Sequence, residues 1–322
     1  MTELCPPTVE DVYSARRTIT PHIVRTPLRR YPGLCELLDA DVWVKHENFQ
    51  VLGSFKPRGG LNLVGNGSED EWKRGYVTAS SGNHGQSICN AARTFGSSAT
   101  VVVPENANPI KVSAMQALGA KVIKHGPYFD VSNVHARALA DENGARYVHA
   151  INEPLLIAGV GTYSLEIHED LGSIDYIIVP VGGGSGASGA SIVSAAVSPS
   201  TRVVGTQAEA APAVYHAWKT GRFEEQKMET AAEGLATAQA YELSVGILRQ
   251  HLHDFVLVSE QAMLDGIELF IRHTRSLVEH AGASSIAAAV KMQEQLKGRR
   301  VVLVASGGNL TVEQLRGAIG TG

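Results

Sequence analysis

The sequence predicts an α/β fold with two domains, each a mostly parallel twisted sheet flanked by helices. Short β-branched runs alternate with longer helix-like stretches along most of the chain, as in successive βαβ units. The runs at 176–179 and 301–304 are apolar on both faces, which is typical of buried parallel strands. A chain of 322 residues also corresponds to about two domains.

The predicted elements follow one another in a regular order. Each strand is a short run of mainly apolar, often β-branched residues, and each helix repeats its apolar residues at three- and four-residue spacing. The predicted strands are residues 41–45, 75–79, 99–103, 120–124, 176–181, 202–206, 255–258 and 300–305. The clearest helices are residues 8–19, 86–95, 111–118, 131–143, 261–273 and 285–296. Residues 219–244 are polar and lack a clear strand, so we expect a surface excursion there, with a functional lid as the alternative.

Composition excludes several classes of partner. The chain has 28 Lys and Arg against 32 Asp and Glu, a net charge of −4, so neither nucleic acid nor a membrane surface is an expected partner. Cys5, Cys35 and Cys89 are scattered and form no Cys-x-x-Cys motif, which indicates a reducing compartment. No apolar window is long enough to span a membrane, and residues 1–10 show no export signal. We therefore expect a cytoplasmic protein.

Three strand exits are rich in glycine and small polar residues. They lie at residues 78–85, 180–189 and 305–309, each directly after a predicted strand. The amide groups that open the following helix have no partner within that helix, so they can bind an anion. The first loop suits a carboxylate and the second a phosphate, while the third offers a single hydroxyl, Ser306.

The second loop allows two interpretations. Gly184 to Gly189 reads Gly-x-Gly-x-x-Gly after a strand, and Glu209 follows at the spacing of a ribose-binding acid, so a nicotinamide-dependent oxidoreductase is one hypothesis. Gly182 and Gly183 precede this pattern and widen the loop, which favours a compact terminal phosphate. A turn that only packs a helix on a strand is the third interpretation.

Lys56 has unusual neighbours for a lysine. It lies between Phe55 and Pro57, with glycines at 53, 59 and 60 and few charges nearby. A partly desolvated lysine has a lowered pKa, and its neutral amine can attack a carbonyl group. A nucleophilic lysine and a phosphate-binding loop together indicate a Schiff base with a phosphorylated aldehyde, as pyridoxal phosphate requires.

With these motifs, the chain resembles the fold-type II pyridoxal-phosphate enzymes, whose fold is like that of the tryptophan synthase β subunit. The similarity is to their serine/threonine dehydratase and serine racemase branch. It extends from Thr26-Pro27-Leu28 and His46-Glu47-Asn48-Phe49-Gln50 to Ser306-Gly307-Gly308-Asn309. Its central motifs are Ser-Phe-Lys-x-Arg-Gly at 54–59 and Ser-x-Gly-Asn-His-Gly at 80–85. The resemblance implies a large cofactor-binding domain of residues 1–74 and 152–322, a small substrate-gripping domain of residues 75–151, and the cofactor in the cleft between them.

The resemblance also implies roles for individual residues. Lys56 would hold the cofactor and remove the substrate Cα proton, Phe55 would pack on the pyridine ring, Asn83 would bind the phenolic oxygen and Ser306 would face the ring nitrogen. The expected phosphate-binding residues are Gly182, Gly183, Gly184, Ser185 and Gly186. The expected substrate-carboxylate residues are Ser80, Ser81, Gly82, Asn83 and His84. Relatives of this kind form homodimers, so we expect one here.

The reaction that the resemblance implies is elimination of water from a β-hydroxy amino acid such as threonine or serine, giving a 2-oxo acid and ammonia. Ser81 supports an alternative, because serine racemases have serine at this position and many threonine dehydratases have alanine. A hydroxyl on the cofactor face opposite Lys56 can exchange the Cα proton from the other side, which racemisation requires.

Several departures from the family pattern bear on cofactor and substrate. Ser185 replaces the usual fourth glycine of the phosphate loop. Gln207 and Ala208 stand where relatives with a divalent cation have a carboxylate, so we expect no metal there. The segments 149–152 and 279–282 replace the usual His-Pro-Phe and Glu-Pro-x-Gly. These differences leave open other hydroxy amino acids, such as 3-hydroxyaspartate or phenylserine, and they leave Glu279 either near the cofactor or at an exposed helix end.

Overall fold

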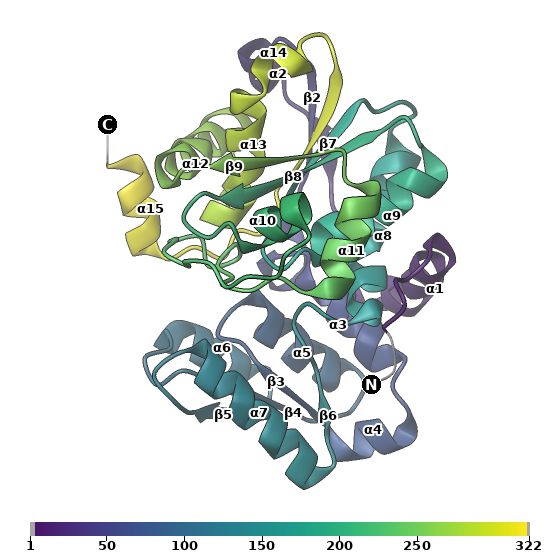
Figure 1. Cartoon of the computed structure of the whole chain (residues 1–322), viewed down its shortest axis with the longest axis vertical. Helices are drawn as coiled ribbons and strands as arrows, with labels where there is room; N and C mark the ends of the chain where they lie inside the picture. Colours follow the sequence, from purple (N-terminus) through teal and green to yellow (C-terminus); the bar gives the residue numbers. More distant parts are fainter. Residues whose placement is uncertain (1–3, 321–322) are drawn as a thin grey trace.

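The computed structural model describes residues 4–320 and has two sheets (Figure 1). The first has six strands in the order β1-β2-β10-β7-β8-β9, and the second has four in the order β5-β4-β3-β6. The strands of the first sheet are β1 (Leu28–Arg30), β2 (Asp41–Lys45), β7 (Tyr176–Pro180), β8 (Arg202–Ala208), β9 (Asp254–Val258) and β10 (Arg300–Val304). Those of the second are β3 (Tyr76–Ala79), β4 (Ala99–Val103), β5 (Lys121–Lys124) and β6 (Arg146–Tyr147).

The helices connect successive parallel strands. The helices that precede β6 in the chain are α1 (Val9–Ile19), α2 (Pro32–Leu38), α3 (Lys56–Gly65), α4 (Glu69–Arg74), α5 (Asn83–Thr94), α6 (Pro109–Ala117) and α7 (Phe129–Asn143). Those that follow are α8 (Pro154–Asp170), α9 (Ser185–Val197), α10 (Ala213–Thr220), α11 (Glu242–His251), α12 (Glu260–Thr274), α13 (His280–Lys291), α14 (Gln293–Leu296) and α15 (Val312–Ile319). Short 3-10 turns lie at η1 (Thr20–His22), η2 (Glu47–Phe49) and η3 (Val51–Gly53).

Helices cover both faces of each sheet. Apart from β1, which pairs antiparallel with β2, all paired strands are parallel. Residues of α12 and α13 form one core layer of the large sheet, and residues of α8, α9, α10 and α11 form the other. In the small sheet, α5 covers one face together with α3, and α7 covers the other (Figure 1). The predicted α/β class with two parallel-rich sheets is confirmed.

Every predicted strand is present within two residues of its expected ends, and two strands were missed. β1 is a three-residue edge strand with two exposed arginines, and β6 has only two residues, so neither has an apolar signature. The prediction of one helix at 285–296 was wrong in extent, because α13 begins at His280 and ends at Lys291, before the short α14. Within residues 4–320, no helix combines the length and apolarity needed to cross a membrane.

Candidate active site

Two of the sequence motifs are joined by backbone hydrogen bonds at the start of α3. The Phe55 amide donates to the carbonyl oxygen of Ser306 (3.1 Å), and the Gly308 amide donates to that of Gly53 (2.9 Å). Asn309 adds a side-chain bond from its Nδ2 to the carbonyl oxygen of Leu52 (2.7 Å). The loop that carries Lys56 is therefore fixed against the loop that follows β10.

The Lys56 side chain reaches toward the glycine loop. Its Nζ lies 3.3 Å from Ser185 Oγ and 5.0 Å from the centre of the Phe55 ring. Burial lowers the pKa of Lys56 to about 8, while the negative charge of Glu279 acts in the opposite direction. At pH 7 about a tenth of this amine is therefore unprotonated, and that form can act as a nucleophile or a base.

The glycines after β7 are required by close packing. A Cβ on Gly182 would lie 2.2 Å from the carbonyl oxygen of Gly234, and one on Gly183 would lie 2.1 Å from Ile151 Cγ1. Gly184 has a φ of +103°, which disfavours residues with a side chain. Among the described residues, the amides of Gly182 to Gly184 have no hydrogen-bond acceptor, and α9 begins immediately after them. This arrangement fits a phosphate group.

Asn83 is held in one orientation by two neighbours. Its Nδ2 donates to Glu279 Oε1 (2.9 Å), and its Oδ1 accepts from Asn309 Nδ2 (2.8 Å). An amide NH₂ group has two protons, so one N–H of Asn83 remains for a ligand. Ser306 is buried nearby, and its backbone carbonyl is the acceptor for Phe55.

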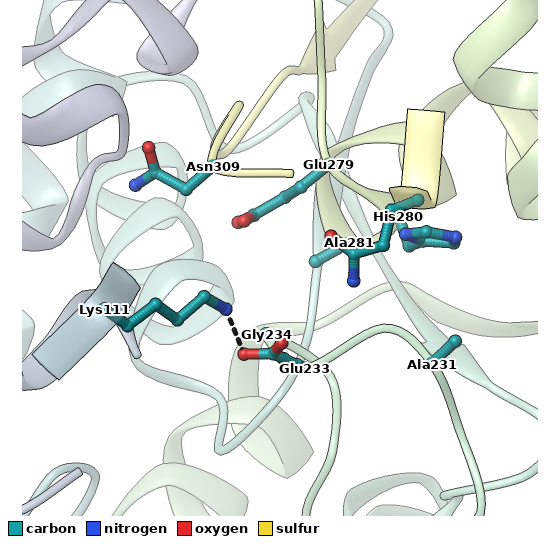
Figure 2. A pocket seen from close by; sticks show the side chains of 9 residues that line it. Lys111, Ala231, Glu233, Gly234, Glu279, His280, Ala281 and Asn309 are labelled. Atoms are coloured by element: carbon teal, nitrogen blue, oxygen red, sulfur yellow. Dashed lines mark hydrogen bonds and ion pairs between the residues drawn. The ribbon is translucent and has the colours of Figure 1, made fainter. Parts of the chain in front are cut away.

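Glu279 lies in the site and not at an exposed helix end. Burial raises its pKa to about 7; Lys111 and the bond from Asn83 act to lower it, and Glu233 raises it further. Figure 2 shows Glu279, Asn309 and Lys111 arranged around one pocket, with Lys111 bound to Glu233. This position could not be chosen from the sequence, because it depends on how the start of α13 packs against the loop after β10. The Glu279 amide donates there to the carbonyl oxygen of Gly307 (3.0 Å).

The turn from Ser80 to Gly82 leads from β3 into α5. No side chain caps this helix, so the amides of its first turn are available to an anion such as a carboxylate. Ser81 is partly buried in this turn. The His84 ring lies 3.1 Å from Thr78 Oγ1, and burial together with the charge of Lys56 lowers the pKa of His84 to about 3, so the ring is neutral.

The segment between α10 and α11 packs onto this site. Gly234 contacts Gly182 of the glycine loop, and Glu233 forms its ion pair with Lys111 of α6. At the end of the segment, the Tyr241 ring lies 4.5 Å from the ring of His149, edge to face. The segment therefore contacts both the small and the large sheet units beside the site.

A buried ion cluster behind α3 was missed by the sequence analysis. Arg58 binds Glu47 through Nε (2.8 Å) and Glu166 through Nη1 (2.8 Å), and Lys45 binds Glu166 as well. All four side chains are at most 7% exposed. Two features of the sequence could have indicated this cluster. One is the Lys-His-Glu sequence at the end of an apolar strand, and the other is the arginine two residues after Lys56.

Gln207 and Glu209, which the sequence marked as positions of possible ligand contacts, are bonded to other residues of the protein. Gln207, at the position of the cation-binding carboxylate of relatives, accepts from the Tyr215 amide (3.0 Å) and donates to the carbonyl oxygen of Gly182 (3.4 Å). Residues 4–320 contain no group of three or more His, Cys, Asp or Glu side chains that could hold a metal ion. Glu209, the candidate ribose-binding acid, pairs with Lys291 at the surface (3.4 Å).

Known proteins resemble this chain over nearly its whole length. The family model "Pyridoxal-phosphate dependent enzyme" matches residues 19–307. L-threonine ammonia-lyase from Thermotoga maritima is 37% identical over 316 residues, which cover 98% of this chain and 79% of the relative. L-threo-3-hydroxyaspartate ammonia-lyase from Saccharomyces cerevisiae is 31% identical over 309 residues, which cover 96% and 95%. The crystal structure of serine racemase from Dictyostelium discoideum matches with a TM-score of 0.89 and 31% identity, over 95% of this chain and 99% of that one.

Proposed function

Because this chain belongs to the pyridoxal-phosphate-dependent enzyme family, in its dehydratase and racemase group, we propose that it eliminates water from a β-hydroxy amino acid to give a 2-oxo acid and ammonia. The observation that carries this proposal is the approach of Lys56 Nζ to Ser185 Oγ (3.3 Å), next to a glycine loop with free amides. When bound, pyridoxal phosphate links to an amine and withdraws electrons from the substrate Cα.

We propose that Lys56 holds this cofactor and takes the Cα proton. A pKa of about 8 suits that role, because the amine can both accept the proton and return to its neutral form near neutral pH. Gly182, Gly183, Gly184, Ser185 and Gly186 would bind the phosphate, Phe55 would pack on the ring, Asn83 would donate its remaining N–H to the phenolic oxygen, and Ser306 would face the ring nitrogen. The Cα–H bond breaks and its proton goes to Nζ, while its electron pair forms the Cα–Cβ double bond. The Cβ–O bond breaks, and the departing hydroxide takes up the proton from Nζ and leaves as water. The enamine product then becomes an imine, which water hydrolyses to the 2-oxo acid and ammonia.

We propose that the amides at the start of α5, in the stretch Ser80, Ser81, Gly82, Asn83 and His84, bind the substrate carboxylate. The Ser80 amide already donates to the carbonyl oxygen of Val102 (3.2 Å) and the Gly82 amide to Ser80 Oγ (3.2 Å), so the amides of Ser81, Asn83 and His84 are the available donors. That assignment makes residues 75–151 the substrate-gripping domain, and 1–74 with 152–322 the cofactor-binding domain. The four-stranded sheet and its helices support this division, although α3 packs with α5 in the core of the small unit. A homodimer and a cytoplasmic location are further proposals, tested by light scattering and by cell fractionation.

Threonine and serine are the proposed substrates, with 3-hydroxyaspartate next because of the relative from yeast. Racemisation through Lys56 and Ser81 is the alternative activity, and the racemase from Dictyostelium supports testing it. The nicotinamide-dependent hypothesis has lost its support, since Glu209 pairs at the surface and the family uses pyridoxal phosphate.

The experiment compares the purified protein with Lys56→Ala and with the surface control Lys297→Ala. Each protein receives L- and D-serine, L-threonine and 3-hydroxyaspartate, and its violet absorbance, 2-oxo acid and product chirality are followed. We expect Lys56→Ala to lose the absorbance band and about 10³-fold or more of the activity, while Lys297→Ala resembles the wild type. A wild type that stays colourless with added pyridoxal phosphate would contradict the proposal. If the protein racemises serine and forms no oxo acid, the racemase alternative is the correct assignment.

A further inference from the structure

Ser185 introduces a hydroxyl into a loop that otherwise presents only backbone groups. It is the first residue of α9, it is 4% exposed, and its Oγ lies 3.3 Å from Lys56 Nζ. The motif of the resembled branch has glycine here, and a glycine cannot make this side-chain contact.

Besides Ser185, the Phe55 ring can stabilise a positive charge on Lys56 Nζ, since its centre lies 5.0 Å away. Ser185 Oγ is the one hydrogen-bond acceptor of Lys56 Nζ within residues 4–320. The cavity beside it is lined by Lys56, Ser185 and His84, together with Gly59, Ala150, Leu156 and Val160. The charge of Glu279 attracts the ammonium group, and the ring of His84, which lines the cavity, is neutral and contributes no charge.

A serine hydroxyl can serve two partners at once. It has one proton to donate and two lone pairs that accept hydrogen bonds. Ser185 can therefore accept from the Lys56 ammonium while it donates to an anion held by Gly182 to Gly184.

We propose that Ser185 is a positioning residue for Lys56. Its hydroxyl accepts a hydrogen bond from the Lys56 amine at the phosphate-binding end of the site, and this bond stabilises the protonated amine that carries the substrate's α-proton. This inference rests on the proposed role of Lys56. It adds no bond-making step, because the proton stays on Nζ and the hydroxyl only accepts a hydrogen bond from it.

The test uses the cofactor-free protein, so its readout does not depend on turnover. The rate at which Lys56 attaches an aldehyde is measured by stopped-flow absorbance from pH 6 to 10, with pyridoxal phosphate and with pyridoxal, which lacks the phosphate. The variants are Ser185→Ala, Ser185→Gly and the matched control Ser188→Ala. Ser188 is buried on the same helix, but its hydroxyl faces the carbonyl oxygen of Ser244 (3.5 Å).

Loss of the acceptor is expected to lower the pKa of the Lys56 amine. A hydrogen bond to a charged group corresponds to a shift of about one pH unit. The pH midpoint of attachment should fall by that amount for both aldehydes in both Ser185 variants, and attachment at pH 7 should become about five-fold faster, since the wild-type pKa is about 8. Ser188→Ala should keep the wild-type midpoint.

Other outcomes separate the possibilities. An unchanged midpoint with weaker attachment of pyridoxal phosphate alone would mean that Ser185 binds only the phosphate, and would overturn the inference. If Ser185→Ala fails to fold, Ser185→Gly, which restores the family residue, gives the same comparison. A wild type that attaches neither aldehyde at Lys56 would instead overturn the proposed function.

Discussion

Lys56 and Arg58 are two residues apart on the first turn of α3, and their surroundings are opposite. Arg58 is fully buried and donates to the carboxylates of Glu47 and Glu166, which raise its pKa further. Lys56 has a hydroxyl as its hydrogen-bond partner, and burial lowers its pKa to about 8. A buried cation with carboxylate partners stays charged and fastens elements together, while one without them is left reactive.

The cluster around Arg58 is neutral as a whole. Lys45 supplies the second positive charge, bonded to Glu166 and to the carbonyl oxygen of Thr26 (2.9 Å). Two cations and two carboxylates cancel, and their polar atoms are largely paired with one another. The cluster ties α3 to β2 and α8, and so fixes the backbone from which Lys56 projects.

The largest expected effect comes from removing the charge at each position in turn. Arg58→Met leaves two buried carboxylates short of a partner, so we expect the free energy of unfolding to fall by about 3–5 kcal/mol. Lys56→Met removes a cation that lacks a carboxylate partner, so stability is unchanged or rises, while cofactor attachment is lost. Urea unfolding and violet absorbance measure the two effects. Equal destabilisation by both variants would refute the distinction, and Arg58→Lys, which keeps the charge, should fall in between.

The pH dependence of stability sharpens the same comparison. The pKa of Lys56 is about 8 in the folded state and 10.5 as a free side chain, so the unfolded chain binds more protons between these values. The contribution of this amine to the free energy of unfolding therefore increases with pH across that window. Below the window, burial of the charged amine destabilises the folded state by about 3 kcal/mol. Glu279, with a pKa of about 7, titrates mostly below the window.

We therefore expect the cofactor-free Lys56→Met variant to exceed the wild type in unfolding free energy at pH 7, and the difference to shrink toward pH 10. Urea unfolding at both pH values measures it, with Ser188→Ala as the control, because that change removes a buried side-chain group that does not titrate and its difference from the wild type should stay constant. A pH-independent difference for Lys56→Met would show that the amine titrates normally in the folded protein.

Lys56 and Arg58 also differ in how well their surroundings could be predicted from the sequence. Parallel strands and glycine-rich strand exits have local signatures, so the sheets and the loops at Lys56, Asn83 and Gly182 were predictable. The ion cluster was not, because Arg58 and Glu166 are 108 residues apart and charged residues are usually exposed. Glu279 was undecided for a similar reason, since only the packing of α13 brings it to Asn83.

The smallest expected effect belongs to the ion pair at the rim, between Lys111 of α6 and Glu233 of the segment over the site. Their side chains are 13% and 51% exposed, so water and salt screen the attraction that burial would strengthen in the Arg58 cluster. A double-mutant cycle with Lys111→Ala and Glu233→Ala should give a coupling in unfolding free energy of about 0.2–1 kcal/mol. The exposed pair Lys297–Asp39, remote from the site, is the matched control.

If this pair holds the segment over the substrate, either variant should also raise KM by about two- to five-fold and leave kcat unchanged, because a coupling below 1 kcal/mol can change binding only by that factor. Raising the salt concentration should reduce the coupling and bring the wild-type KM toward that of the variants, whereas disruption of Lys297–Asp39 leaves KM unaltered. A coupling that is large and insensitive to salt would mean that the pair is desolvated when the segment is closed. Lys111 and Glu233 would then behave like Arg58 and Glu166, as a structural pair and not as a closing contact.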